Sequence, residues 1–219
     1  MCGIFGFSWQ NRGNLSFADS KAALSQLFLL SEQRGKEAAG IAIKNKSTKQ
    51  IGVLKQNITA SRFIRQSSYE NFLDSNLKPA FGQGGLEQGV SVIAHTRLVT
   101  NGDRDTNVNN QPVTKPGGVI VHNGIVVNVD DLWAKYPDIK RELYVDSEVL
   151  LALILHFSEQ GMTLPAAVAA LFNEVKGSAS VALHFTKLNV MVLATNNGSL
   201  YYTKDDKGGL VFSSEQYSL

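Results

Sequence analysis

Cysteine is nearly absent from this chain, which has a single thiol, at position 2, among 219 residues. A disulfide within the chain and a metal site built from thiolates are therefore excluded, and the composition gives no sign of an oxidising compartment. Long apolar runs are absent too, since Val149 to Leu155 falls well short of the ~20 residues that span a bilayer. The amino terminus also lacks the basic segment and the long apolar run of a secretory signal. These absences predict a cytoplasmic protein without membrane association.

An excess of either charge is also lacking, with 21 Lys and Arg against 19 Asp and Glu and a formal net charge of +2. This balance argues against a protein dedicated to binding nucleic acid or a membrane surface. The glycine-rich stretch Phe81 to Gly85 lacks the Lys-Ser/Thr ending of a phosphate-binding P-loop and is predicted to be a plain flexible loop. None of the four histidines has metal-ligand spacing to other histidines or carboxylates. We expect no metal and no cofactor.

Periodic patterns predict strands at both ends of the chain and two groups of helices between them. Strands are expected at Cys2 to Ser8, Ala39 to Lys44, Gln50 to Lys55, Val90 to His95, Gly118 to His122, Ser180 to Phe185, Val190 to Thr195, Leu200 to Thr203 and Leu210 to Ser213. Helices are expected at Phe17 to Gln33, Thr59 to Asp74, Ser147 to Glu159 and Pro165 to about Glu174. Asp146 is the predicted N-cap of the third helix. This order indicates a layered α+β fold in which residues 1–219 form one domain.

The single cysteine stands where it could act as a nucleophile that carries its own base. Removal of Met1 is sterically plausible because Cys2 is small and is followed by Gly3. The exposed α-amino group would titrate at about 7.7 to 8.0, close to cellular pH, and could take the thiol proton. The competing interpretation is a small buried residue in an edge strand, since free cysteine is among the most buried residue types.

Groups suited to amide hydrolysis occur elsewhere in the sequence. Asn123 and Gly124 follow a predicted strand and could stabilise an oxyanion, although Asn-Gly is also the commonest tight-turn dipeptide. Arg97 can grip a carboxylate with two hydrogen bonds, and Asp146 can receive an ammonium. A surface salt bridge for Arg97 and a helix cap for Asp146 are the structural alternatives. Together the two charges suit a substrate with an α-carboxylate and an α-ammonium.

Seven short segments occur in an order and with a spacing that resemble one family. They are Cys2 to Gly6, Arg34 to Ala42, His95 to Gly102, Asn110 to Pro112, Val121 to Gly124, Val145 to Glu148 and Ser213 to Gln216. The chain resembles the glutaminase domain of the class II glutamine amidotransferases, which are N-terminal nucleophile hydrolases. The segment around Arg97 is most similar to those of glucosamine-6-phosphate synthase and glutamine phosphoribosylpyrophosphate amidotransferase, and less similar to that of asparagine synthetase.

The resemblance implies a fold, a reaction and a set of residue roles. The implied fold is a four-layer α/β/β/α sandwich, and the implied reaction is hydrolysis of L-glutamine to glutamate and ammonia through a γ-glutamyl thioester. A synthase domain or subunit would receive the ammonia. The resemblance implies that Cys2 is the nucleophile and, through its α-amino group, the base, and that Asn123 and Gly124 form the oxyanion hole. It implies that Arg97 binds the glutamine carboxylate and Asp146 its ammonium. The implied pocket lining is Thr100, Asn101 and Gly102, and Arg34 would support the nucleophile's loop.

Two segments depart from the family pattern. Leu98 and Asn101 stand where glucosamine-6-phosphate synthase has an aromatic residue and a histidine, and Lys36 to Ala38 replaces the more usual aromatic-Asp-Ser. The first departure is expected to affect coupling to an acceptor site more than hydrolysis. The histidines are expected to be structural rather than catalytic: His95, His122, His156 and His184.

Two other functions stay open on the sequence. An acylase of the same N-terminal nucleophile class also begins with cysteine, and a regulatory module could keep the fold without turnover. The departures favour the module, whereas the intact Cys2, Arg97 and Asp146 favour an enzyme. Because no room for a synthase domain follows the last matching segment before Leu219, we expect a stand-alone subunit or a fragment of a longer protein.

Overall fold

Two antiparallel sheets lie face to face at the centre of the fold. The computed structural model describes residues 2–10, 14–46, 48, 50–98 and 107–219. These residues form a six-stranded sheet whose strands are, in spatial order, β11 (Tyr201–Lys204), β12 (Leu210–Ser213), β1 (Gly3–Trp9), β6 (Val90–Arg97), β2 (Ala38–Asn45) and β3 (Ile51–Gln56). They also form a four-stranded sheet of β10 (Met191–Thr195), β9 (Gly177–Phe185), β8 (Gly118–Val126) and β7 (Val113–Lys115).

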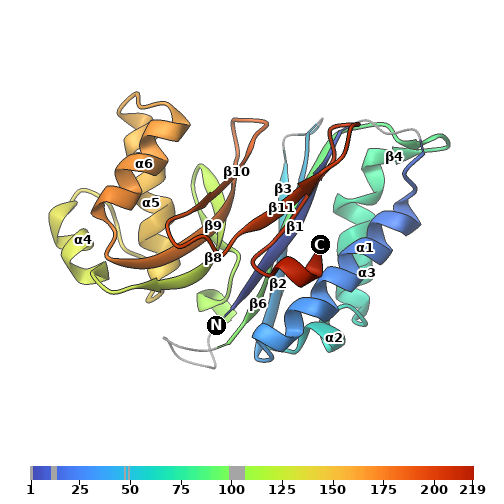
Figure 1. The fold of residues 1–219 in the computed structure, drawn as a ribbon, viewed down its shortest axis with the longest axis horizontal. Coiled ribbons are helices and arrows are strands. Elements are labelled where there is room, and N and C mark those ends of the chain that lie inside the picture. The colour runs from blue at the N-terminus through green and yellow to red at the C-terminus, as the bar shows by residue number, and fades with distance from the viewer. Residues whose placement is uncertain (1, 11–13, 47, 49, 99–106) are drawn as a thin grey trace.

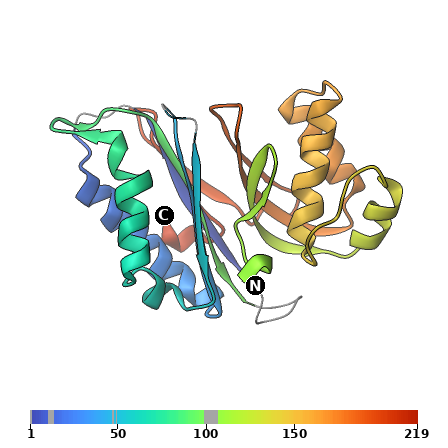
Figure 2. The ribbon, with the colours of Figure 1, turned by 180° about the vertical axis from the view of Figure 1, so that it is seen from behind.

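Helices cover the outer face of each sheet, which makes four layers (Figure 1). The six-stranded sheet carries α1 (Phe17–Ser31), α2 (Ala60–Phe63) and α3 (Ser67–Asn76), and the four-stranded sheet carries α4 (Val129–Lys135), α5 (Asp146–Glu159) and α6 (Leu164–Glu174). Short 3-10 helices are η1 (Glu32–Arg34), η2 (Lys78–Ala80), η3 (Asn107–Asn109) and η4 (Gln216–Ser218). Within the described residues, no helix is long and apolar enough to cross a bilayer. The view from behind shows the same four layers, in agreement with the predicted α/β/β/α sandwich (Figure 2).

The first helix begins at a capping box, which explains why it starts where the sequence predicts. Ser16 Oγ accepts a hydrogen bond from the backbone N–H of Asp19, and Asp19 Oδ2 accepts one from the backbone N–H of Ser16. Leu24 and Phe28 on the buried face of α1 then pack against the sheet. The Phe28 ring meets that of Phe5 edge-on, with 4.9 Å between the centroids.

Alternation along the strands divides the core into three layers. In β1, Phe5 and Phe7 face the helices, whereas Ile4 faces the other sheet. In β8, Ile120 faces the helices and Val121 faces the six-stranded sheet. Apolar side chains from both sheets therefore fill much of the space between them.

Most predicted elements are present, with small shifts at their ends. The helix expected to run to Gln33 ends at Ser31 and continues as η1. The single helix expected at Thr59 to Asp74 is two helices, α2 and α3, and the short elements β7 and α4 were not predicted. One prediction was wrong, because Phe81 to Gly85 is not a plain loop but part of a hairpin of β4 (Phe81–Gly82) and β5 (Gly85–Leu86). Gly85 has a φ of 108°, a conformation that favours glycine and allows the tight turn.

Two further corrections concern candidate site residues. β8 does not end at His122, because its ladder with β9 continues to Val126, so Asn123 and Gly124 are strand residues rather than the start of a loop. Asp146 is the first residue of α5 rather than its N-cap, a position held by the preceding residue. Its carboxylate instead accepts a hydrogen bond from the backbone N–H of Val126 in β8, at 3.1 Å.

Two histidines are buried between the sheets, His184 in β9 and His95 in β6. Each has its pKa lowered to about 3, mainly by burial and then by neighbouring cations, which are Lys44 near His184 and Arg97 near His95. Both rings are therefore uncharged in the folded protein at neutral pH. In the unfolded chain a histidine binds a proton below about pH 6.5.

The free energy of unfolding is therefore expected to fall as the pH drops below 6.5, by about 1.4 kcal/mol per pH unit for each such histidine until the pH nears 3. Urea unfolding between pH 7.5 and 4.5 measures this slope. His184→Phe removes one titrating group. The change in its free energy of unfolding per pH unit should therefore be smaller by about 1.4 kcal/mol, the contribution of one histidine. Titration of carboxylates changes the stability of wild type and variant equally, so it cancels in the comparison. Identical slopes in the two proteins would show that His184 is not buried in its neutral form.

Candidate functional site

Cys2 lies directly before β1, at one end of the space between the sheets. β1 pairs with β12 on one side and β6 on the other, so Cys2 adjoins a central strand and not an edge strand. Its thiol is partly buried and donates to the carbonyl oxygen of Leu98, 3.6 Å from Sγ. Burial raises the pKa of this thiol, an effect that Arg97 opposes and Asp146 adds to. A thiol in this state is protonated at neutral pH and needs a base before it can attack a carbonyl group.

Arg97 is the last residue of β6 and is only 6% exposed. Its Nη1 donates to Oδ1 of Asn110 at 2.6 Å, and its carbonyl oxygen accepts from the backbone N–H of Glu37 at 3.0 Å. Gly35 lies so close that a Cβ there would stand 2.3 Å from the carbonyl carbon of Arg97, a space that only glycine can share. The guanidinium is therefore buried at a strand end and is not a surface group.

Asp146 begins α5, and its carboxylate reaches back to β8. One oxygen accepts from the backbone N–H of Val126, and the other lies 3.6 Å from Nδ1 of His122. Burial by itself would raise the pKa of Asp146, but the His122 contact and the backbone N–H groups of Val126 and Ser147 outweigh it and hold that pKa below its ordinary value. The helix N-terminus also favours a negative charge. The carboxylate is ionised at neutral pH and can receive a cation.

Asn123 and Gly124 are adjacent in β8. Alternation places Asn123 on the same face as Val121, toward the six-stranded sheet and the end of β1 where Cys2 lies. Asn123 is 2% exposed, and among the described residues its Oδ1 has no hydrogen-bond partner. Gly124 has a φ of 154°, and a Cβ there would lie 2.0 Å from the carbonyl oxygen of Ser178. The carboxamide thus has a polar atom that the fold does not use, and its neighbour must be glycine.

A carboxamide clamp connects the segment after η3 to β8. Gln111 donates through Nε2 to the carbonyl oxygen of His122 at 3.0 Å, and its Oε1 accepts from the His122 backbone N–H at 2.5 Å. Gly40 in β2 permits this approach, since a Cβ there would stand 2.1 Å from the Gln111 carbonyl oxygen. The His122 ring then faces α5, with Nδ1 3.3 Å from Ser147 Oγ. The sequence suggested only a loop-holding role for His122 and missed its contact with Asp146.

Arg34 connects η1 to the last segment of the chain. Its Nη1 lies 2.5 Å from Oε1 of Glu215. The neighbouring Ser214 donates its backbone N–H to the carbonyl oxygen of Ile4 at 2.8 Å and accepts from the Ile4 N–H through Oγ at 3.1 Å. Arg34 is therefore linked to the start of β1 through this last segment, and its role as a support for the nucleophile stays a prediction.

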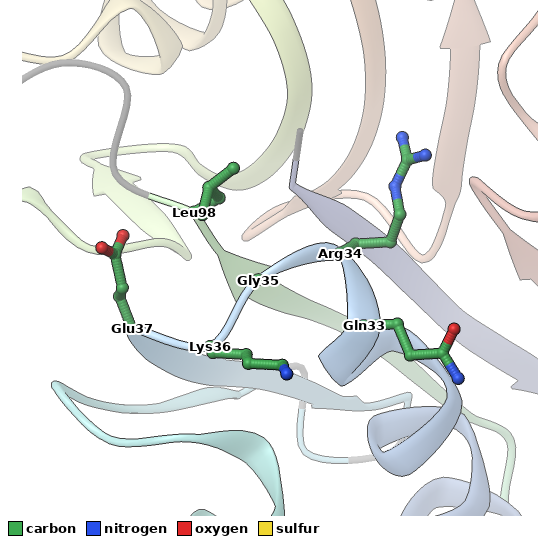
Figure 3. Close-up of a pocket in the computed structure, with 6 residues that line it drawn as sticks. All are labelled: Gln33, Arg34, Gly35, Lys36, Glu37 and Leu98. Carbon is green, nitrogen blue, oxygen red and sulfur yellow. The ribbon is translucent and has the colours of Figure 1, made fainter.

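Of the residues that depart from the family pattern, Lys36, Glu37 and Leu98 line one pocket of about 420 Å³ (Figure 3). Its lining consists of Gln33, Arg34, Gly35, Lys36, Glu37 and Leu98. Figure 3 shows the Arg34 side chain directed away from Leu98 and Glu37. Leu98 is 40% exposed, and its carbonyl oxygen is the acceptor for the Cys2 thiol. Lys36 and Glu37 therefore share a pocket with Leu98, the residue whose carbonyl oxygen the thiol contacts.

The structure leaves some predicted residues untested and adds others. Thr100, Asn101 and Gly102, predicted to line the substrate pocket, lie outside the described residues. Asn110 lies within a segment that matches the family, but its contact with Arg97 was not predicted. The sequence predicted Lys55 only as a strand residue and assigned it no role in the site. In the part of the chain that is described, no three His, Cys, Asp or Glu side chains come together as a metal site.

Comparison with known sequences points to one family. A family profile described as a glutamine amidotransferase domain matches residues 95–219. The glutamine–fructose-6-phosphate aminotransferase (isomerizing) of Geobacillus kaustophilus is 28% identical over 214 residues, which are 96% of this chain and 30% of that protein. The protein of the same name from Pyrobaculum aerophilum is 28% identical over 217 residues, 94% of this chain and 30% of that protein. The chain thus spans less than a third of the length of these relatives.

Two solved structures share the fold. The glutamine phosphoribosylpyrophosphate amidotransferase of B. subtilis, complexed with ADP and GMP, has a TM-score of 0.67 and 22% identity, over 99% of this chain and 42% of that chain. An allosteric regulatory enzyme of purine biosynthesis has a TM-score of 0.69 and 22% identity, with the same coverage of 99% and 42%. These similarities confirm the α+β sandwich expected from the sequence.

Proposed function

Because the chain belongs to the glutamine amidotransferase domain family, we propose that it hydrolyses L-glutamine to glutamate and ammonia with Cys2 as nucleophile. The observation that carries this proposal is the grouping of a partly buried thiol, a buried guanidinium and an ionised carboxylate at one end of the space between the sheets. Glutamine has one α-carboxylate and one α-ammonium, so the opposite charges of Arg97 and Asp146 match it. Residues 1–219 would then constitute one glutaminase domain.

The reaction begins once removal of Met1 turns the backbone nitrogen of Cys2 into an α-amino group. That amine takes the thiol proton, and Sγ attacks the side-chain carboxamide carbon to form an S–C bond. The carboxamide of Asn123 and the backbone N–H of Gly124 stabilise the oxyanion. The C–N bond then breaks, and the α-ammonium returns the proton to the departing ammonia. Water attacks the γ-glutamyl thioester, breaks the S–C bond and releases glutamate.

The ammonia would pass to a synthase domain or subunit. The aligned relatives extend well beyond the matched region, as expected if a second domain uses the product of the first. The transfer of ammonia and the cytoplasmic location both stay predictions.

Labelling and turnover measured on the same purified protein test this function. Chains that have lost Met1 are expected to hydrolyse L-glutamine and to take up one equivalent of a glutamine-like diazoketone. Because Cys2 is the only cysteine in the chain, a single thiol adduct identifies its site. Intact-mass analysis reports Met1 removal and the adduct together, and glutaminase activity should disappear in step with the adduct.

Two results would favour the other functions considered from the sequence. Turnover of an N-acyl amide without turnover of glutamine would assign the site to an acylase. Chains with a free Cys2 amino terminus that neither hydrolyse glutamine nor take up the diazoketone would be a module that shares the fold without turnover.

A further inference from the structure

Three backbone carbonyl groups converge on the amino group of Lys55, in β3. Its Nζ donates to the carbonyl oxygens of Val108 at 3.0 Å, Asn110 at 2.7 Å and Pro112 at 3.2 Å. An ammonium has three N–H donors, so three such contacts engage all of them. Lys55 thereby fixes the segment 108–112 against the edge of the six-stranded sheet.

The same segment also reaches back to the end of β3. Asn107 donates through Nδ2 to the carbonyl oxygen of Lys55 at 3.1 Å. Asn110 donates through Nδ2 to the side-chain oxygens of Asn57 and, at 3.1 Å, Asn107. With both N–H groups of its carboxamide engaged, Asn110 presents Oδ1 to Arg97 and accepts from Nη1 at 2.6 Å. A guanidinium is planar and rigid, so an anchored Nη1 sets the direction of its other N–H groups.

Lys55 places a second positive charge near Arg97, which support of a loop alone does not explain. Burial, and then the charge of Arg97, lowers the pKa of Lys55 to about 8. Nearby like charges repel, so two cations placed beside one another cost free energy that support of a loop does not by itself require. Two cations that share Asn110 instead make the potential positive where a carboxylate would bind.

We propose that Lys55 and Asn110 are positioning residues that hold the Arg97 guanidinium in the orientation that grips the substrate carboxylate. Lys55 acts on the backbone of the segment 108–112, and Asn110 acts on the guanidinium. The inference rests on the proposed function, in which Arg97 binds the α-carboxylate of glutamine. Recognition of that carboxylate therefore depends on a lysine in β3, which is separated from β6 by β2.

The test compares L-glutamine with its α-carboxamide analogue, in which the α-carboxylate is replaced by a neutral amide. In Lys55→Met, the ratio of kcat/KM for the two substrates is expected to fall about 10- to 100-fold, the range for losing a hydrogen bond to a charged group. The loss should appear as a higher KM for glutamine with little change in kcat. Turnover of the α-carboxamide should change little.

Two further variants complete the design. Asn110→Ala removes the oxygen that accepts from Arg97 without adding a charge, so the preference for glutamine should fall at least as far as in Lys55→Met. Lys187→Met, an exposed lysine after β9, is the matched control and should retain the wild-type preference. Protection of Cys2 from a neutral haloacetamide by each substrate gives a second readout that does not depend on turnover.

The outcomes separate this inference from the proposed function. If wild type prefers glutamine and both variants keep that preference, the inference is overturned while the function stands. An equal loss for both substrates would assign Lys55 and Asn110 to structural support alone. If wild type shows neither turnover nor protection by glutamine, the proposed function fails and the inference fails with it. Should Lys55→Met unfold, Asn110→Ala still decides the question, because it leaves the contacts of Lys55 with the backbone of residues 108–112 in place.

Discussion

Replacing Cys2 with alanine is expected to lower kcat for glutamine hydrolysis by ~10⁴-fold or more, the order of loss that follows removal of a catalytic nucleophile. No second cysteine exists in the chain to take its place. The fold should persist, because Cys2 lies before β1 and, among the described residues, the hydrogen bond of its thiol is to the backbone oxygen of Leu98. Alanine is small enough for Met1 removal to continue. Glutaminase assays on both proteins, with intact mass recorded for each, measure the effect of the thiol alone.

The pH dependence of the wild-type reaction tests the proposed base. Because burial raises the pKa of the Cys2 thiol, the thiolate does not form unaided at neutral pH. We therefore expect kcat/KM to rise with pH through about 7.7 to 8.0, the ordinary range of an α-amino group. Chains that retain Met1 have no amino group at this position and should be inactive throughout. Activity equal to wild type in Cys2→Ala, or in chains that retain Met1, would contradict the mechanism.

Local patterns were sufficient to predict most of the fold, because alternation and helical spacing report which face of an element is buried. Errors arose where strand pairing, which a local pattern does not report, overrides a local preference. Asn123 and Gly124 are typical of a tight turn, yet β9 continues to pair with them and keeps them in a strand. The stretch Phe81 to Gly85 resembled a loop, but pairing of Phe81 with Leu86 makes it a hairpin.

The candidate site likewise contains residues that could be predicted from the sequence and residues that could not. Cys2, Arg97 and Asp146 could be chosen from the sequence because each has a distinctive side chain within a segment that matches the family. The Lys55 contacts could not, because Lys55 recognises backbone carbonyl groups, which every residue has. Only the folded chain brings those carbonyl groups to β3, and only it brings Lys36 and Leu98 into one pocket.

Replacing Asn123 with alanine is expected to lower kcat by about 10²- to 10³-fold, the loss that follows removal of one oxyanion-hole donor. The KM for glutamine should change little, because the negative charge appears on the oxygen only as the transition state forms. The free energy of unfolding of Asn123→Ala should not fall together with its turnover. Among the described residues, Oδ1 of Asn123 is buried without a partner, so alanine removes an unsatisfied polar atom. We expect the free energy of unfolding to stay level or rise while turnover falls.

Asn128 supplies the matched control, since its carboxamide is also buried but is satisfied by the fold. Nδ2 donates to the carbonyl oxygen of Glu174 at 2.9 Å, and Oδ1 accepts from the backbone N–H of Lys176 at 2.8 Å. Asn128→Ala should lower the free energy of unfolding by about 1 to 3 kcal/mol, because its partners lose their hydrogen bonds, and should leave kcat near the wild-type value. If Asn123→Ala instead behaved like Asn128→Ala, Asn123 would be a packing residue and the oxyanion would need another donor. The contrast has a single physical origin, because the fold uses both ends of the Asn128 carboxamide, whereas Oδ1 of Asn123 has no partner among the described residues and contributes no hydrogen bond to stability.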